Sequence, residues 1–314
     1  MRKNTVREIW ARGEAVVNGW LSIPSSFSAE VMAHQGFDSL TVDMQHGVVD
    51  YQVGVSMLQG ISTTEVIPLA RIPWNDPARI MKILDAGAYG VICPMINTRE
   101  QAEALVQACK YPPRGYRSWG PVRASLYMGG DYGDHANDDV IVMPMIETAE
   151  AVKNIDDILS VPGVDAIYVG PSDLSLALGL KPRLDQTDPP VVEAQQLIAR
   201  ACKKHGVIAG IHNATAAYAV KMIEQGYQFV TLASDSRFMR PRRAKRWAWF
   251  ARRERRRASF WRTRAGSIGF AILRSRSSPA LNVHLRTPRA GSSLGPRLAR
   301  HLTRPRDLAP RAIR

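Results

Sequence analysis

The sequence predicts one (β/α)8 barrel followed by a basic tail, and three observations support this architecture. Eight short apolar runs between residues 16 and 235 alternate with longer amphipathic stretches, a pattern typical of strand and helix units around a parallel sheet. Eight strands match the count of a TIM barrel, whereas open doubly wound sheets, the alternative, usually have roughly five to seven. The composition also changes abruptly near Met239.

The predicted strands are apolar segments rich in Val, Ile and Leu. In chain order they are residues 16–23, 39–45, 66–72, 90–96, 140–147, 166–170, 207–213 and 229–235. Because parallel strands are covered on both faces, near-continuous apolar runs of this kind are expected in such a barrel.

Helix start and stop residues lie between these strands. Asp76 can cap a helix that has Pro77 in its first turn and ends at Gly87, and the helix that begins at Ser28 ends at Gly36. Similar residues flank predicted helices in 98–109 and 148–159. The connection 111–139 is rich in Gly, Pro and aromatic residues, so we expect a functional loop that reaches over the barrel mouth or a neighbouring subunit.

Charge divides the chain into two parts. Residues 1–239 hold 20 Lys+Arg and 26 Asp+Glu, whereas residues 240–314 hold 22 and 2, and every basic residue there except Lys245 is Arg. We therefore predict a barrel domain in 1–239, and a tail in 240–314 that is disordered or translated from a shifted reading frame. The last barrel helix would then be atypical or missing. The alternative is a genuine basic extension that binds nucleic acid or another acidic surface.

Cysteine usage and hydropathy predict a cytoplasmic protein. Cys93, Cys109 and Cys202 are widely spaced and form no CxxC motif, so neither a disulfide framework nor a zinc site is indicated. The sequence shows no signal peptide and no apolar run of transmembrane length. The motifs GxxxxGK[ST] and GxGxxG are absent, which argues against nucleotide binding in the usual manner.

Polar residues end several of the predicted strands, where this fold places its chemistry. Glu147 and Asp173 end neighbouring strands about 4.8 Å apart, so both carboxylates can reach one cation. Such an oxygen-rich pair suits Mg²⁺ or Mn²⁺ and leaves positions open for substrate. The alternative for each acid is a helix cap or a first-turn charge.

Two cationic or titratable side chains accompany this acidic pair. Arg71 ends an apolar run and can bind a carboxylate or an enolate oxygen, although an internal salt bridge with Asp43 or Asp76 is the alternative. His46 precedes Gly47 at the mouth and can move protons near neutral pH, although a lone histidine at such a position is more often a loop residue without a role.

The segment 170–174, GPSDL, turns from the sixth strand into a helix. Gly170 allows close approach of a ligand, and the backbone N–H groups of the turn can receive a small carboxylate.

These segments, in this order, resemble the HpcH/HpaI aldolase family of class II pyruvate aldolases, which includes 4-hydroxy-2-oxoheptanedioate aldolase. The resemblance covers residues from about 5 to 239 and runs through six blocks: GWLSIPSSFSAEVMAHQGFDSLTVDMQHG, PLARIPWNDPARIMKILDAGAYGVICPMI, YPPRGYRSWGPVRA, PMIETAEAVKNIDDI, VPGVDAIYVGPSDLSLALG and VTLASDSRF. It implies a TIM barrel of the phosphoenolpyruvate/pyruvate-domain type. It also implies reversible cleavage of a 4-hydroxy-2-oxo acid to pyruvate and an aldehyde through a metal-bound pyruvate enolate, as in aromatic-compound catabolism.

The resemblance also assigns metal and catalytic roles. Glu147 and Asp173 would bind Mg²⁺, Mn²⁺ or Co²⁺, and Arg71 would stabilise the enolate. His46 would move protons, with Asp85 orienting it and Asp43 supporting the same cluster.

Other roles concern the substrate. Main-chain groups of Ser172 and Asp173, beside Gly170, would hold the substrate carboxylate, and Gln45, which stands where many members have Glu, is given no role. No strand end carries a Lys, so no Schiff base is expected. Candidates for aldehyde recognition are Trp20, Trp74, Trp119 and the loop 111–139.

The family resemblance implies a homo-oligomer, a hexamer or a trimer of dimers. The competing enzyme class is a citrate-lyase β or malyl-CoA-lyase type of barrel, which would use a similar carboxylate pair on CoA thioesters.

Overall fold

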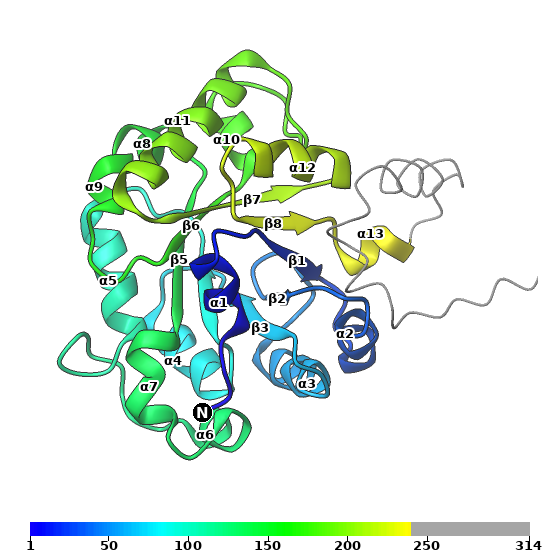
Figure 1. The fold of residues 1–314 in the computed structure, drawn as a ribbon, viewed down its shortest axis with the longest axis vertical. Helices are drawn as coiled ribbons and strands as arrows, with labels where there is room; N and C mark the ends of the chain where they lie inside the picture. The colour runs from blue at the N-terminus through cyan, green and yellow to red at the C-terminus, as the bar shows by residue number, and fades with distance from the viewer. Residues whose placement is uncertain (240–314) are drawn as a thin grey trace, which may run out of the picture. The chain divides into compact units, whose positions relative to one another are not determined.

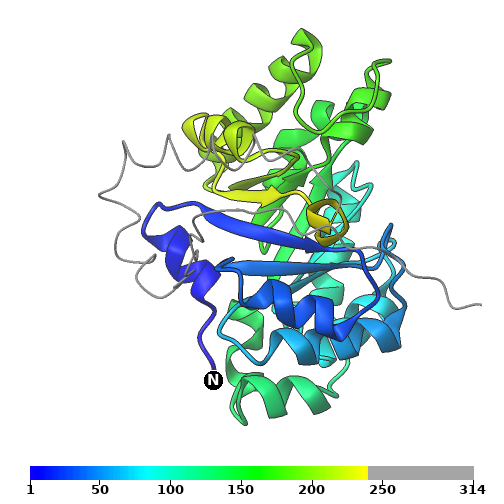
Figure 2. The same cartoon turned by 90° about the vertical axis from the view of Figure 1, so that its right-hand side faces the viewer.

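The computed structural model describes residues 1–239 and contains a closed barrel of eight parallel strands, which confirms the predicted fold class. Each strand pairs with the next along the chain, and β8 pairs with β1 to close the barrel (Figures 1 and 2). The strands are β1 Val16–Leu21, β2 Ser39–Asp43, β3 Ile67–Arg71, β4 Gly90–Cys93, β5 Ile141–Ile146, β6 Ala166–Val169, β7 Ile208–Asn213 and β8 Phe229–Leu232. Residues 240–314, with the predictions made for the tail and the last helix, lie outside the described residues.

Helices surround the strands. They are α1 Thr5–Ala11, α2 Ser26–Ala33, α3 Tyr51–Ile61, α4 Pro77–Asp85, α5 Arg99–Cys109, α6 Val122–Met128, α7 Tyr132–Asp139, α8 Ala149–Lys153, α9 Ile155–Leu159, α10 Pro171–Ala177, α11 Pro189–His205, α12 Ala216–Glu224 and α13 Asp235–Met239. The predicted capping at α4 is present: the Asp76 side chain accepts the Ala78 N–H, Pro77 opens the helix, and Gly87 follows it at a φ of +100°.

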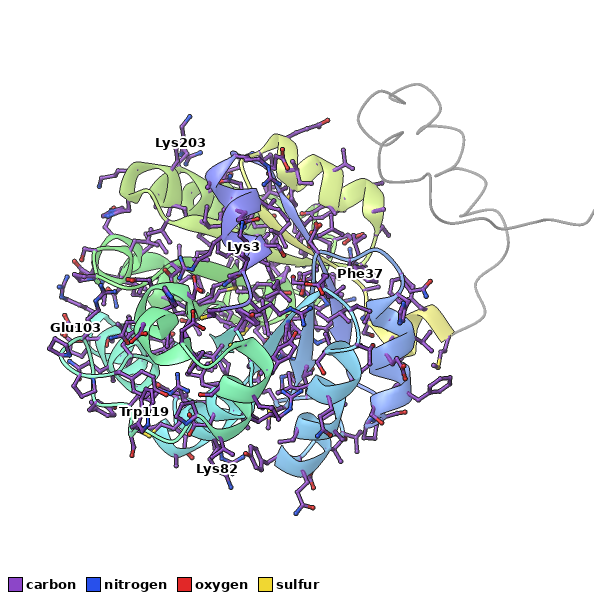
Figure 3. All side chains as sticks on the ribbon, turned by 60° about the horizontal axis from the view of Figure 1, so that its bottom comes forward. Lys3, Phe37, Lys82, Glu103, Trp119 and Lys203 are labelled. Atoms are coloured by element: carbon purple, nitrogen blue, oxygen red, sulfur yellow. The ribbon has the colours of Figure 1, made fainter. Side chains whose placement is uncertain are left out.

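The strands are buried on both faces. Every residue of β2, β3, β4, β5 and β6 is buried, because helices cover the outside and side chains fill the inside (Figure 3). The predicted strands run one to three residues too far at most carboxyl ends. Those extra residues, which include Glu147 and Gly170, belong to the loops at the barrel mouth.

The connection 111–139 differs from its prediction. It contains two short helices, α6 and α7, that lie beside the N-terminal segment (Figure 1). Asn4 donates to the Asp139 carbonyl, and the buried Lys110 ammonium donates to the Asn137 and Val140 carbonyls, just before β5 begins. The segment therefore packs at the amino ends of the strands, and the expectation that it covers this chain's own barrel mouth is wrong.

The chain leaves the barrel through α13, which is described as far as Met239. Exposed apolar side chains lie on this helix and on α2 and α12, namely Phe27, Val31, Val220, Ile223, Phe238 and Met239. None of the helices in residues 1–239 is long and apolar enough to cross a membrane.

Candidate functional site

The predicted polar residues gather at the carboxyl ends of four strands. Asp43 and Arg71 end β2 and β3, and they are partners in the strand register. Ile146 and Val169 are partners in the pairing of β5 with β6, so Glu147 and Gly170 follow at the same level of the barrel. Parallel closure thus brings residues from distant parts of the chain to one mouth.

Asp43 and Arg71 form a buried bidentate ion pair. Arg71 Nε lies 2.9 Å from Asp43 Oδ1, and Arg71 Nη2 lies 2.7 Å from Asp43 Oδ2. Burial alone would raise the Asp43 pKa, but the Arg71 hydrogen bond and charge outweigh it and hold the pKa below its usual value. Arg71 therefore does form the internal salt bridge considered as the alternative, and its partner is Asp43. Asp76 pairs with Arg79 instead. The pair uses only one edge of the guanidinium, so Nη1 has no partner among the described residues.

Trp20 contacts both members of this ion pair. Its indole N–H donates to Asp43 Oδ2 at 3.1 Å, and the Arg71 guanidinium carbon lies 4.7 Å from its ring centroid. Trp20 is only 2% exposed, so it offers almost no surface to a substrate. The expectation that Trp20 contacts substrate is thus unsupported in this structure, where its contacts position Asp43 and Arg71.

His46 is exposed in the loop after β2. Its backbone N–H and that of Gln45 donate to Asp43 Oδ1, both at 3.1 Å, so one carboxylate fixes both Arg71 and the loop. Gly47 makes the turn possible, since a Cβ there would lie 2.2 Å from the Asp43 carbonyl oxygen. The His46 side chain makes no hydrogen bond or ion pair within the described residues.

Asp85 does not orient His46 within this chain. It ends α4, which runs back to the amino ends of the strands, and its carboxylate pairs with Arg117 Nη2 at 2.6 Å. The Arg117 side chain is fully buried and also donates to the Tyr132 hydroxyl. The role predicted for Asp85 is therefore wrong for a single chain, because α4 carries Asp85 to the opposite end of the barrel.

Glu147 is held tightly at the mouth. It is 3% exposed, and its Oε1 accepts the Met95 backbone N–H at 2.9 Å, with Met95 in a left-handed conformation at φ +58°. Gly170 supplies room for the carboxylate, since a Cβ at this position would lie 2.4 Å from Glu147 Oε2. Gly170, which was predicted to allow close approach of a ligand, therefore provides space for the Glu147 side chain.

Electrostatics at this carboxylate fit a bound cation. Burial raises the Glu147 pKa to about 7, and the nearby Asp173 carboxylate adds to this effect, whereas the Met95 hydrogen bond and Arg71 oppose it. A divalent cation would relieve both unfavourable effects, because it replaces water around Glu147 and neutralises the two acids. No group of three or more His, Cys, Asp or Glu with metal-site geometry occurs in residues 1–239. Two carboxylates would leave coordination positions that water and substrate can complete.

Ser172 and Asp173 lie in the first turn of α10. Pro171 opens this helix, and the N–H groups of its first turn have no partner inside the helix. They can donate hydrogen bonds to a small carboxylate, which stays the role expected for them.

Three further polar residues line the barrel just below the mouth. The Tyr168 hydroxyl lies 2.9 Å from His212 Nδ1 and donates to Thr231 Oγ1 at 2.7 Å. The Tyr168 ring stacks on Trp20 with centroids 5.6 Å apart, and His212 meets Trp20 edge-on at 4.9 Å. The sequence offered one signal for this group, a lone imidazole near the end of an otherwise apolar strand.

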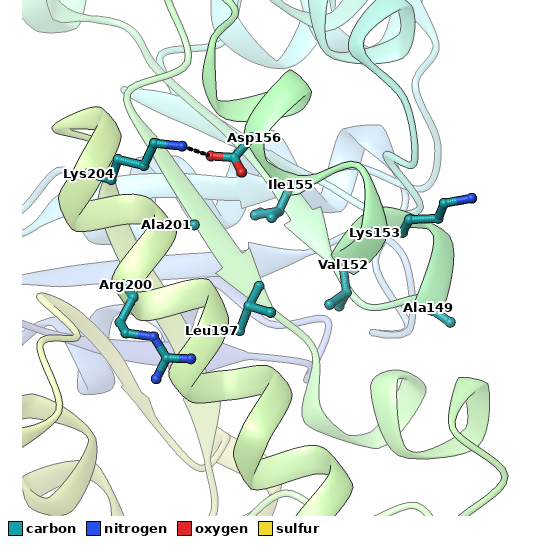
Figure 4. Close-up of a pocket in the computed structure, with 9 residues that line it drawn as sticks. All are labelled: Ala149, Val152, Lys153, Ile155, Asp156, Leu197, Arg200, Ala201 and Lys204. Atoms are coloured by element: carbon teal, nitrogen blue, oxygen red, sulfur yellow. Dashed lines mark hydrogen bonds and ion pairs between the residues drawn. The ribbon is translucent and has the colours of Figure 1, made fainter.

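Other aromatic and concave features lie away from this cluster. Trp74 is exposed in the loop after β3, at the mouth end, whereas Trp119 is exposed near Tyr111, at the amino ends of the strands. A surface groove of about 550 Å³ lies between α8, α9 and α11 (Figure 4). Apolar side chains such as Leu197 line it, with Arg200 and Lys204 beside them, and it contains no predicted site residue.

Comparison with known proteins agrees with the resemblance found in the sequence. The profile of a family described as HpcH/HpaI aldolase/citrate lyase matches residues 19–241. A hydroxypyruvate/pyruvate aldolase from Rhizorhabdus wittichii is 42% identical over 232 residues, which are 74% of this chain and 92% of that protein. A 2-dehydro-3,6-dideoxy-6-sulfogluconate aldolase from Pseudomonas putida is 39% identical over 233 residues, covering 73% of this chain and 89% of that protein.

A solved structure shares the fold. The crystal structure of an HpcH/HpaI aldolase/citrate lyase family protein from Burkholderia cenocepacia J2315 superimposes with a TM-score of 0.70 at 30% sequence identity. The match covers 82% of this chain and 99% of that one. The predicted family resemblance is therefore confirmed.

Proposed function

Because the chain belongs to the HpcH/HpaI aldolase/citrate lyase family, we propose that it is a divalent-metal-dependent aldolase acting on 4-hydroxy-2-oxo acids. Its similarity to curated aldolases supports a carbon–carbon lyase. The observation that carries it is the arrangement at one barrel mouth: a buried cation, Arg71, fixed by Asp43, near the carboxylates of Glu147 and Asp173.

Glu147 and Asp173 would hold the metal, which would be Mg²⁺, Mn²⁺ or Co²⁺. When bound, the cation supplies Lewis acidity to the oxygens of the 2-oxo acid. The first-turn N–H groups of Ser172 and Asp173 would bind the substrate carboxylate.

During bond cleavage, side chains at the mouth would stabilise charge and transfer protons. The bond between C3 and C4 breaks, its electrons move to the keto oxygen of the pyruvate half, and the C4 hydroxyl loses its proton as the aldehyde forms. Arg71, whose Nη1 is not used by Asp43, would stabilise the negative oxygen. His46, exposed at the mouth, would take the C4 hydroxyl proton through a water and return a proton to C3.

The activities for which relatives are named suggest which reactants to examine. One relative is named for hydroxypyruvate and pyruvate, and another for a sulfonated sugar acid, so both donor and aldehyde vary among similar proteins. We also expect a homo-oligomer, to be measured by light scattering after gel filtration.

The test uses the full chain after EDTA treatment and gel filtration. Pyruvate release is measured over 4-hydroxy-2-oxo acids of different length and terminal charge, with Mg²⁺, Mn²⁺, Co²⁺ or no metal. We expect release that depends on added metal. Release at an undiminished rate in EDTA would refute the metal-dependent mechanism, and turnover of a CoA thioester in place of free oxo acids would favour the citrate-lyase type.

A further inference from the structure

His212 is a polar residue at the barrel mouth that the proposed catalytic steps do not use. It is the penultimate residue of β7 and is half-buried. Its ring lies edge-on to Trp20, and the Arg71 guanidinium stacks over the same Trp20 ring. Strand β7 stands on the side of the barrel next to β6, which leads into Asp173. The imidazole therefore lies in the barrel just below the mouth that holds the acidic pair.

The hydrogen-bond network below His212 favours one tautomer of its ring. Ser39 and Thr41 hydroxyls donate to Asn18 Oδ1, so the Asn18 amide nitrogen points to Thr231 and donates to its Oγ1 at 3.0 Å. Tyr168 donates its proton to the same Thr231 oxygen. With the Tyr168 proton directed to Thr231, the Tyr168 oxygen accepts a hydrogen bond from His212, which assigns the ring proton to Nδ1.

The opposite ring nitrogen, Nε2, is left as an acceptor. It makes no hydrogen bond within residues 1–239, and the His212 side chain is only partly buried. Burial and the charges of Arg71 and Arg237 lower the His212 pKa to about 3. A histidine of this kind is neutral at physiological pH, so it is suited to hydrogen bonding and not to acid–base catalysis.

We propose that His212 Nε2 accepts a hydrogen bond from a hydroxyl group of the substrate and makes this aldolase selective for hydroxylated reactants. An acceptor nitrogen cannot bind a carboxylate or a carbonyl oxygen, whereas a hydroxyl donates to it directly. The hydroxyl belongs to the donor oxo acid or to the aldehyde, and these two sources are chemically equivalent at Nε2. The inference rests on the proposed aldolase function.

Kinetics with matched reactants test the selectivity and separate the two sources. Hydroxypyruvate is compared with pyruvate using one aldehyde, and glycolaldehyde with acetaldehyde using one donor. Relative to the wild type, His212→Leu should lower kcat/KM about tenfold for the hydroxylated member of one pair, with little change for its partner. His212→Gln keeps an acceptor oxygen and should retain most of the preference. If His212→Leu left the ratio of kcat/KM values within each pair unchanged, whether or not the values themselves fell, the proposal would be overturned.

A measurement without turnover separates this inference from the proposed function. In full-length protein labelled with ¹⁵N-histidine and held with Mg²⁺, the His212 signals are identified by their loss in His212→Gln. We expect a neutral ring protonated at Nδ1 from pH 8 to pH 5, and an Nε2 shift that moves with hydroxypyruvate or glycolaldehyde but not with pyruvate or acetaldehyde. Protonation at Nε2, or no response to either hydroxylated compound, would overturn the proposal even in an active enzyme. Absence of any aldol turnover, with the NMR result as expected, would instead count against the proposed function.

Discussion

Asp43 binds Nε and Nη2 of Arg71 and leaves Nη1 without a partner among residues 1–239. This geometry requires a planar guanidinium, because a lysine ammonium cannot engage both carboxylate oxygens and still present a fixed donor to a substrate. The buried ion pair is thus compatible with the predicted catalytic role, since it orients the cation without using all its donors.

Arg71→Lys should lower kcat/KM about 100-fold, as expected when a positioned donor to a developing negative oxygen is lost. The measurement is pyruvate release under initial-rate conditions at saturating metal. Arg79→Lys is the matched control, because Arg79 forms an exposed pair with Asp76. Similar rates for the two variants would remove Arg71 from the mechanism.

Glu147→Gln should weaken Mn²⁺ binding by more than about 100-fold, because changes to outer-shell partners alone cost about 10 to 100-fold. Isothermal titration calorimetry and the EPR signal of free Mn²⁺ measure the affinity directly. Glu150→Gln provides the control, since Glu150 is an exposed acid in the next helix. Wild-type affinity in Glu147→Gln would contradict the ligand assignment.

Gly170→Ala should also reduce Mn²⁺ affinity, although it removes no ligand. The added methyl group would lie 2.4 Å from Glu147 Oε2 and would displace the carboxylate. At Gly130, by contrast, a Cβ meets nothing within 4 Å, so Gly130→Ala is the control. The same calorimetric titration measures both variants, and equal affinities would show that Glu147 does not need the space at Gly170.

The architecture and most of the mouth were predictable from the sequence because they depend on local patterns. Apolar runs predicted eight strands, and polar residues at their ends predicted Asp43, Arg71, Glu147 and Asp173. The strand ends themselves were placed too late, since apolar residues continue into the loops beyond the last paired residue.

Contacts between distant segments were not predictable in this way. Asp85 and Arg117 lie 32 residues apart, and only the direction of α4 decides that Asp85 meets Arg117 and not His46. The network of His212, Tyr168 and Thr231 depends on the register of three neighbouring strands, which spacing along the chain does not reveal.

The metal-free protein should lose stability as pH rises through the range set by Glu147. The Glu147 pKa is about 7 in the folded chain, against an ordinary value of 4.5, so the folded state retains a proton that the unfolded state has released. The free energy of unfolding therefore begins to fall near pH 4.5 and stops falling above pH 7. The total decrease is at most about 3 kcal/mol.

Urea unfolding in EDTA at pH 5, 6, 7 and 8 measures this effect as the difference between Glu147→Gln and wild type. The free energy of unfolding of Glu147→Gln should rise relative to that of the wild type up to about pH 7, and the difference should then stay constant. A difference independent of pH would mean that Glu147 titrates normally.

Asp85→Ala should destabilise the fold by about 3 kcal/mol, because it leaves the buried Arg117 guanidinium without its anionic partner. Asp138→Ala is the matched control: Asp138 forms an exposed pair with Arg114, so its loss should cost less than about 1 kcal/mol. Urea unfolding gives both values, and Asp85→Ala/Arg117→Met should recover part of the loss by removing the unpaired charge. If Asp85→Ala instead unfolded like wild type and altered only the pH dependence of pyruvate release, Asp85 would act on His46, and the pairing within this chain would be incidental to stability.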